Sequence, residues 1–132
     1  MLFHVKAGQG SRTNPMLARV FIEQDRTRVD FAYQVLKKYV RGGWIRIAPY
    51  THIKIDGIDK KFGLIEAIGI PISPNRLEFE SKMDWQYFTL IFEPIPLTNS
   101  VINILEEENP SLDDFNFYHV EINLDEGIEV ID

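Results

Sequence analysis

The chain has 132 residues, of which 45% are hydrophobic and 26% are charged, and its formal net charge at pH 7 is −6. This composition excludes a disordered or fibrous chain and predicts one globular domain over residues 1–132. The sequence has no cysteine, which excludes a disulfide framework, a thiolate nucleophile and a Cys-ligated zinc site. It also has no apolar leader after Met1 and no apolar run of membrane-spanning length, so we expect a cytoplasmic protein without membrane contact.

The first third of the chain is predicted to contain the main helix of the fold. Residues 2–6 alternate weakly, as in a strand, and residues 16–23 fit either a short helix or a buried strand. From residue 27 to residue 41 apolar side chains recur every three or four positions, which is typical of an amphipathic helix. The apolar positions of this stripe are Val29, Ala32, Tyr33, Leu36, Tyr39 and Val40. Gly42-Gly43 is a stop signal, so we predict one long helix over residues 27–41.

The middle of the chain changes to strand patterns. Residues 44–47 and 52–58 alternate apolar and polar side chains, and residues 64–72 are rich in β-branched ones. Residues 77–80 and 86–92 have the same character, and we predict that they form a hairpin around residues 81–84.

The last third is predicted to contain a short helix and a closing hairpin. Thr98 or Asn99 caps a helix with Val101, Ile102 and Leu105 on one face. Residues 117–124 and 127–131 are expected to pair as strands across a tight turn. The predicted fold class is therefore α+β: a curved, largely antiparallel sheet or small barrel, the helix 27–41, and one or two short helices.

Charge is sorted along the chain. Residues 1–62 contain twelve Lys and Arg against five Asp and Glu, whereas residues 63–132 contain two against fifteen. In one small domain this sorting predicts a basic surface and an acidic surface. We predict the basic face from Arg26, Arg28, Lys37, Lys38, Arg41, Arg46 and Lys54. We predict the acidic face from Glu106, Glu107, Glu108, Asp113, Asp114, Asp125 and Glu126.

Two such surfaces favour a non-enzymatic interaction or assembly protein. Each face can dock on a surface of opposite charge, and head-to-tail contact between copies would give a homo-oligomer. The partner is therefore either a second copy or another protein. The sequence leaves open whether the two faces instead neutralise each other within one molecule.

Two other functions remain open at this stage. The basic residues, with aromatic residues among them, also fit a nucleic-acid-binding accessory protein. Asp56 and Asp59, followed by Glu80 and Lys82, resemble the PD-(D/E)xK nuclease core over residues 27–82, which implies a Mg²⁺-dependent nuclease. The histidines have no metal-ligand spacing, so we otherwise expect neither a metal site nor a cofactor. They are His4, His52 and His119.

A resemblance to known sequences concerns one segment. Residues 93–98 read Glu-Pro-Ile-Pro-Leu-Thr and are followed by the predicted short helix and by an aromatic strand with the sequence Phe115-Asn116-Phe117-Tyr118. Over residues 93–122 the chain resembles small uncharacterised proteins of Bacteroidetes and of their phages or mobile elements. The resemblance implies no activity. It implies a phage or mobile-element setting, in the host cytosol or in a virion.

Overall fold

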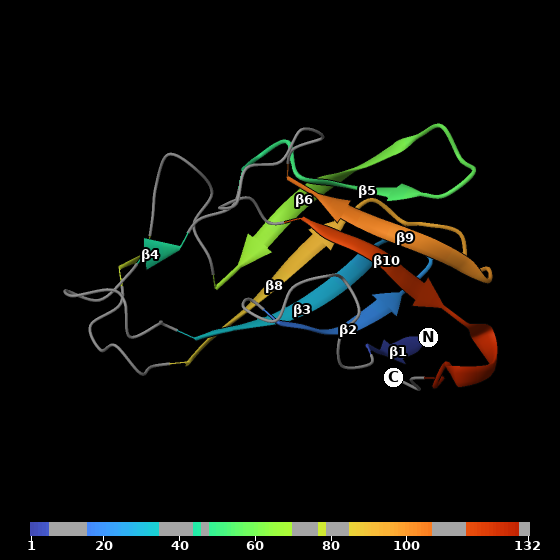
Figure 1. Cartoon of the computed structure of the whole chain (residues 1–132), viewed down its shortest axis with the longest axis horizontal. Helices are drawn as coiled ribbons and strands as arrows, with labels where there is room; N and C mark the ends of the chain where they lie inside the picture. The colour runs from blue at the N-terminus through green and yellow to red at the C-terminus, as the bar shows by residue number, and fades with distance from the viewer. Residues whose placement is uncertain are drawn as a thin grey trace.

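The computed structural model describes residues 1–5, 16–34, 44–45, 48–69, 77–78, 85–106 and 116–129 (Figure 1). Nearly all of these residues lie in β-strands or in the turns between them. The strands are β1 (Leu2–His4), β2 (Met16–Ile22), β3 (Thr27–Gln34), β4 (Trp44–Ile45), β5 (His52–Ile55), β6 (Lys61–Ile68), β7 (Leu77–Glu78), β8 (Trp85–Phe92), β9 (Ser100–Leu105) and β10 (Phe117–Ile122). A single 3-10 turn, η1 (Leu124–Glu126), follows the last strand.

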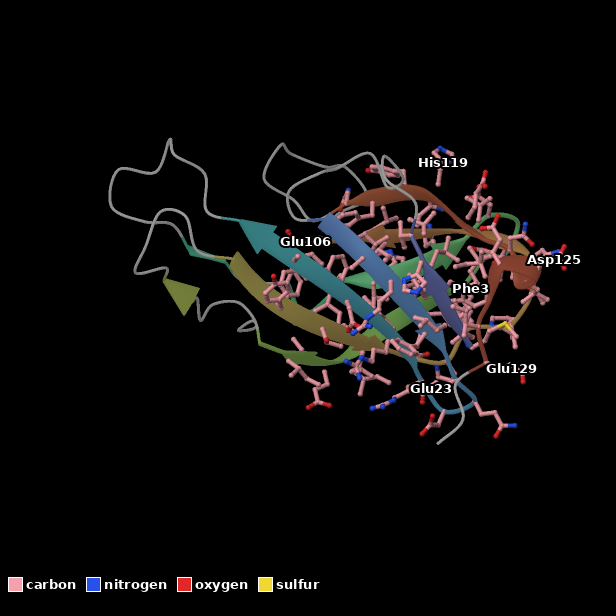
Figure 2. All side chains as sticks on the ribbon, turned by 90° about the horizontal axis from the view of Figure 1, so that it is seen from below. Phe3, Glu23, Glu106, His119, Asp125 and Glu129 are labelled. Carbon is pink, nitrogen blue, oxygen red and sulfur yellow. The ribbon has the colours of Figure 1, made fainter. Side chains whose placement is uncertain are left out.

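Eight of the strands form one antiparallel sheet in the order β1-β2-β3-β8-β6-β5-β9-β10, and β4 pairs with β7. The sheet curls so that β9 and β10 lie over β2 and β3 (Figure 1). The chain leaves β10 through η1, and Ile128 then forms an antiparallel bridge with Leu2 of β1. Figure 2 shows β1, with Phe3, beside the turn that carries Asp125. The two edges of the sheet therefore meet, and the sheet is a nearly closed barrel.

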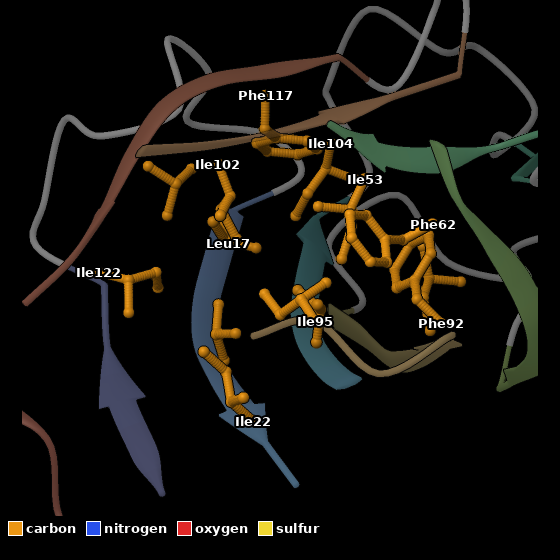
Figure 3. Packing of buried hydrophobic residues seen from close by; sticks show 14 of the residues in the cluster. Leu17, Ile22, Ile53, Phe62, Phe92, Ile95, Ile102, Ile104, Phe117 and Ile122 are labelled. Carbon is orange, nitrogen blue, oxygen red and sulfur yellow. The ribbon is translucent and has the colours of Figure 1, made fainter. Parts of the chain in front are cut away.

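The core fills the inside of this curved sheet. Side chains on a strand alternate between its two faces, so every second residue of each strand points inward. On β8 the inward residues Phe88, Leu90 and Phe92 are at most 3% exposed. Ile102 and Ile104 of β9 approach from the opposite side of the barrel (Figure 3). Burial of this apolar surface, at about 25 cal/mol per Å², is the main stabilising contribution to the fold.

The predicted helix over residues 27–41 is wrong over its described part. Residues 27–34 form β3, which pairs with β2 on one side and with β8 on the other. The inward residues of β3 are Thr27, Val29 and Phe31, which recur with a period of two. The sequence analysis did not recognise this period because Val29 and Ala32 also have helical spacing. The ring of Phe31 stacks on Phe88 at 5.0 Å between centroids, a contact that only the strand conformation supplies. Residues 35–41 lie outside the described residues.

Other predicted elements are also corrected. The short helix after Thr98 is strand β9, because Ile102 and Ile104 point into the core as alternate residues. Residues 16–22, which fitted either a helix or a strand, form β2. The described residues contain no α-helix, so the fold is nearly all antiparallel sheet and not α+β. No helix in the described part of the chain has the length and apolar character needed to cross a membrane.

The two predicted hairpins are not formed either. β7, at residues 77–78, pairs with β4, while β8 pairs with β3 and β6. After β10 the chain turns at η1, and Ile128 bridges to β1 instead of returning along β10. The predicted strand over residues 127–131 is only an isolated bridge at Ile128 within its described part, residues 127–129. The pairing partners of Ile128 and of β8 lie far away in the sequence.

Candidate functional site

Four turns lie together at one end of the barrel. They comprise residues 23–26, 56–60, 93–99 and 123–127. The pairing register places them there, because Ile22 is opposite Thr27, Thr27 is opposite Phe92, and Ile122 is opposite Ser100. Figure 2 shows Glu23, Asp125 and Glu129 at this end.

The turns, together with Glu129 after the last of them, carry a concentration of carboxylates, which we call the acidic end. Its members are Glu23, Asp25, Asp56, Asp59, Glu93, Asp125, Glu126 and Glu129. All except Glu23 are exposed. Four cationic groups lie at the same end: Arg26, Lys60, Lys61 and the N-terminal ammonium of Met1, which donates to the carbonyl oxygen of Ile22 at 2.8 Å. Eight carboxylates against four cationic groups leave a net negative charge at this end. The negative electrostatic potential of the acidic end would therefore attract a basic surface.

The backbone around η1 fixes the position of Asp125 and Glu126. The side chain of Asn123 accepts a hydrogen bond from the backbone N–H of Asp125 at 3.0 Å. The backbone N–H of Leu124 donates to Oδ1 of Asn99 at 2.8 Å, which ties the turn to the start of β9. The two carboxylates are thus displayed from a turn with defined geometry.

The predicted acidic face is only partly brought together. Asp125 and Glu126 belong to the acidic end. Glu106 follows β9 at the opposite end of the barrel, where its carboxylate accepts a hydrogen bond from the backbone N–H of Ala48 at 2.9 Å. Glu107, Glu108, Asp113 and Asp114 lie outside the described residues. Four members of the acidic end come from the first half of the chain, so position in the sequence does not define this surface.

The described residues of the predicted basic face lie in three separate places. Arg26 lies in the turn after β2 and forms an ion pair with Glu23 at 3.5 Å. Arg28 lies on the outer side of β3. Lys54 lies on β5, opposite Lys61 of β6 and Asn103 of β9. Lys37, Lys38, Arg41 and Arg46 lie outside the described residues.

A cluster that the sequence analysis missed occupies the outer side of β2, β3 and β8. Asp30 is 8% exposed and accepts hydrogen bonds from Nε of Arg19 at 2.6 Å and from Nε of Arg28 at 3.1 Å. Oγ1 of Thr89 donates to the same carboxylate at 2.7 Å. The guanidinium groups of Arg19 and Arg28 lie 5.6 and 5.5 Å from the ring centroid of Phe21, within the range of a cation–π contact.

The electrostatics of this arginine cluster follow from the buried carboxylate. Burial alone would raise the pKa of Asp30, but the hydrogen bonds from Thr89, Arg19 and Arg28 outweigh it and hold the pKa below its ordinary value of 3.8. Two guanidinium groups and one carboxylate leave one net positive charge. The side chains of Arg19 and Arg28 remain 45% and 38% exposed, so the cluster presents oriented cations to solvent.

The sequence did contain a signal for this cluster. Arg19 and Phe21 alternate on one side of β2, and Arg28 and Asp30 alternate on one side of β3. A hairpin around residues 23–26 places Arg19 opposite Asp30 and Phe21 opposite Arg28. Interpreting residues 27–41 as a helix concealed this pairing.

The histidines do not gather into one site. His4 is exposed on β1, and His52 is buried with Nδ1 3.0 Å from the carbonyl oxygen of Tyr50. His119 is exposed at a bulge of β10. Within the described ranges no group of three or more His, Asp or Glu side chains is arranged to hold a metal ion.

The residues of the nuclease hypothesis are only partly described. Asp56 and Asp59 lie in the exposed turn after β5, and Asp56 accepts a hydrogen bond from Nδ2 of Asn103 at 2.9 Å. Glu80 and Lys82 lie outside the described residues.

No protein-family model, curated protein or solved structure matches this chain. The surfaces described above are therefore the basis for a proposed function.

Proposed function

We propose that the protein is a non-enzymatic interaction or assembly component that docks on itself or on a protein partner through its charged surfaces. The observation that carries the proposal is the acidic end, where turns distant in the sequence bring eight carboxylates and four cationic groups to one end of the barrel. This end carries a net negative charge, so a basic surface would be attracted to it.

The ion pairs of the arginines support the same proposal. Arg19 and Arg28 are bound to Asp30, and Arg26 is bound to Glu23. Two carboxylates of the first half of the chain, Asp30 and Glu23, thus partly neutralise these three cations. Asp125 and Glu126 are exposed at η1, where their negative charge would attract a basic partner over distance and raise the rate of association.

The experiment compares two variants of equal charge change for partner capture. Asp125→Asn/Glu126→Gln removes two carboxylates from the acidic end, whereas Glu66→Gln/Glu121→Gln removes two exposed carboxylates elsewhere. The native chain and the second variant should retain the same protein from an extract of the source organism. The first variant should lose it, and raised salt should release it from the native chain. Equal capture by both variants would contradict the proposal, as would a native chain that retains no protein and stays monomeric at low salt.

The phage or mobile-element setting, the nucleic-acid-binding alternative and the nuclease alternative stay predictions. A mobility shift that disappears in Arg41→Glu/Arg46→Glu would support nucleic-acid binding. Mg²⁺-dependent cleavage that disappears in Glu80→Ala and in Lys82→Ala would support the nuclease.

A further inference from the structure

The two arginines of the arginine cluster are held in fixed positions. Nε of Arg19 donates to Oδ2 of Asp30 at 2.6 Å, and Nε of Arg28 donates to Oδ1 of the same carboxylate at 3.1 Å. Both guanidinium groups also lie within 5.6 Å of the centre of the Phe21 ring. Such contacts orient the arginines before a ligand arrives, so less side-chain entropy is lost when the ligand binds.

The two arginines have more hydrogen-bond donors than Asp30 can accept. Two guanidinium groups carry about ten N–H donors, whereas a carboxylate has about four acceptor sites, one of which Thr89 occupies at 2.7 Å. Among the described residues, Asp30 is the only hydrogen-bond acceptor of either guanidinium group. The side chains of Arg19 and Arg28 are partly exposed. Most of their donors therefore face a group that arrives from solvent.

The strand register determines what such a group would meet. Arg19 is directly opposite Asp30 and Phe21 is directly opposite Arg28, so these side chains occupy four neighbouring positions of one face. Asp30 is buried, which leaves two cations and an aromatic ring at the surface. His4 of β1 is exposed and directly opposite Arg19, so a further hydrogen-bond donor borders the cluster.

The charge of the arginine cluster matches that of one carboxylate. Its net charge of plus one would be neutralised by one Asp or Glu side chain. The two oxygens of a carboxylate also match the parallel N–H groups of a guanidinium in a bidentate pair. A second carboxylate would then face the two guanidinium groups from solvent, as Asp30 faces them from the sheet.

A phosphate group fits the arginine cluster less well. A phosphate monoester carries about −1.5 to −2 charges at pH 7, which is more than the cluster can neutralise. Arg28 and Glu66 are both directly opposite Ile91, on its two sides, so an exposed carboxylate lies about two strand spacings, or 10 Å, from Arg28. The chain also has a net charge of −6, which repels a polyanion such as nucleic acid.

We propose that the arginine cluster binds one acidic side chain, Asp or Glu, of a protein partner through the guanidinium groups of Arg19 and Arg28. The inference rests on the proposed function and names a second docking surface for it. This surface lies on the outer side of β2 and β3, and its charge is opposite to that of the acidic end.

NMR titration of the native chain with a blocked tripeptide, Ala-Glu-Ala, at constant ionic strength tests the proposal. The side-chain Nε–H signals of Arg19 and Arg28 should shift together and saturate, because one carboxylate contacts both groups. Arg26 is the control within the same molecule, since its side chain is 42% exposed and pairs with Glu23 at 3.5 Å. Its signal should stay unchanged. The blocked tripeptide Ala-Gln-Ala has nearly the same shape without the charge and should shift none of the three signals.

Substitutions at Arg19 separate the geometry of the guanidinium group from its charge. Arg19→Gln should raise the dissociation constant of Ala-Glu-Ala by about tenfold or more, because a charged hydrogen-bond donor is lost. Arg19→Lys keeps the charge but loses the parallel N–H pair, so it should also weaken binding, whereas Arg26→Lys should not. Circular dichroism and the thermal midpoint establish that each variant is folded. If Arg19→Gln fails to fold, Arg19→Lys and the native titration still test the contact.

The outcomes separate this inference from the proposed function. The inference would be overturned by Arg19 and Arg28 signals that do not respond to Ala-Glu-Ala, that respond equally to Ala-Gln-Ala, or that respond equally in Arg26. Unchanged binding in Arg19→Gln would overturn it too. Tighter binding of inorganic phosphate than of Ala-Glu-Ala at the same ionic strength would assign the cluster to a phosphate ligand, and would again overturn it.

The acidic end is tested independently of the arginine cluster. Partner capture that depends on Asp125 and Glu126, by a chain whose arginines do not bind Ala-Glu-Ala, would overturn this inference alone. Binding of Ala-Glu-Ala by a chain whose partner capture is unaffected by Asp125→Asn/Glu126→Gln would overturn the role of the acidic end alone.

Discussion

Arg19 of β2 and Asp30 of β3 face each other directly across the strand pair, with Nε of the arginine 2.6 Å from Oδ2 of the carboxylate. Arg28 and Thr89 bind the same carboxylate from its own strand and from β8. One buried charge therefore connects three adjacent strands on their outer side. Its removal would leave two guanidinium groups and a hydroxyl without their shared acceptor.

The Asp30 carboxylate is expected to make stability depend on pH in the acid range. Its pKa in the folded chain lies below the ordinary value of 3.8, so the folded state binds this proton less readily than the unfolded state does. The stabilisation is fully present above pH 3.8 and is lost as the pH falls through the lower, folded-state pKa. Asp30→Asn should lower the free energy of unfolding at neutral pH by about 1–3 kcal/mol. In this variant the free energy of unfolding should also fall less steeply as the pH is lowered, which urea denaturation at a series of pH values measures.

Asp25→Asn is the control for this prediction, because Asp25 is exposed in the turn between the same two strands. The role assigned to Asp30 would be contradicted if the free energy of unfolding fell equally steeply with decreasing pH in the native chain, in Asp25→Asn and in Asp30→Asn.

The sequence predicted strands well where apolar and polar residues alternate plainly, as in residues 52–55. It failed at residues 27–34, because Val29, Ala32 and Tyr33 also fit a helical stripe. The strand is selected by contacts with distant segments: Phe31 stacks on Phe88 and lies 5.2 Å from the ring of Phe117. Local propensity is weak compared with such burial. The sequence alone does not show which segments pair with residues 27–34. That pairing decides between the strand period of two and the helical period.

The candidate surfaces were predicted less well than the strands. Sorting charge by position in the chain found Asp125 and Glu126, but it assigned Asp56 and Asp59 to the opposite half. The acidic end exists because β-turns from both halves meet at one end of the sheet. The arginine cluster depends on the register of β2 with β3, in which a shift of one residue would move every side chain to the other face. Both surfaces therefore follow from topology.

Thr27 is expected to stabilise the proline-containing segment after β8. Its hydroxyl is fully buried, donates to the carbonyl oxygen of Glu93 at 3.1 Å, and accepts from the backbone N–H of Ile95 at 3.0 Å. Ile95 is itself a core residue. Thr27→Val keeps the shape but leaves the buried N–H without its acceptor, so the free energy of unfolding should fall by about 1–3 kcal/mol. Thr98→Val, at an exposed position of the same segment, should change it by less than about 0.5 kcal/mol. Equal effects of the two substitutions in denaturant titrations would argue against this role.

His119 is the one described residue other than glycine with a positive φ, and its value is 57°. It lies at the bulge of β10, where its backbone N–H donates to Oδ1 of Asn103 on β9 at 3.1 Å. The left-handed conformation costs about 1–2 kcal/mol for a residue with a side chain. His119→Gly should therefore raise the thermal midpoint or leave it unchanged. Asn103→Ala should lower it, because the bulge loses its hydrogen bond to β9 and Asp56 loses the one from Nδ2 of Asn103. Destabilisation by His119→Gly comparable to that by Asn103→Ala would show that the histidine side chain stabilises the bulge.

Gly57 and Gly69 form a matched pair that separates backbone strain from steric contact. Both have positive φ, 86° and 80°, so alanine is strained at either position. A Cβ on Gly57 would meet nothing within 4 Å, whereas a Cβ on Gly69 would lie 2.8 Å from the carbonyl oxygen of Tyr87. That oxygen belongs to the backbone of β8, so relief of the overlap requires the end of β6 to move away from β8.

We expect Gly57→Ala to lower the free energy of unfolding by about 1 kcal/mol. Gly69→Ala should cost about 1–3 kcal/mol more in the free energy of unfolding, from the added overlap. Equal losses of stability in the two variants would mean that β6 does not approach β8 as closely as the structure has it.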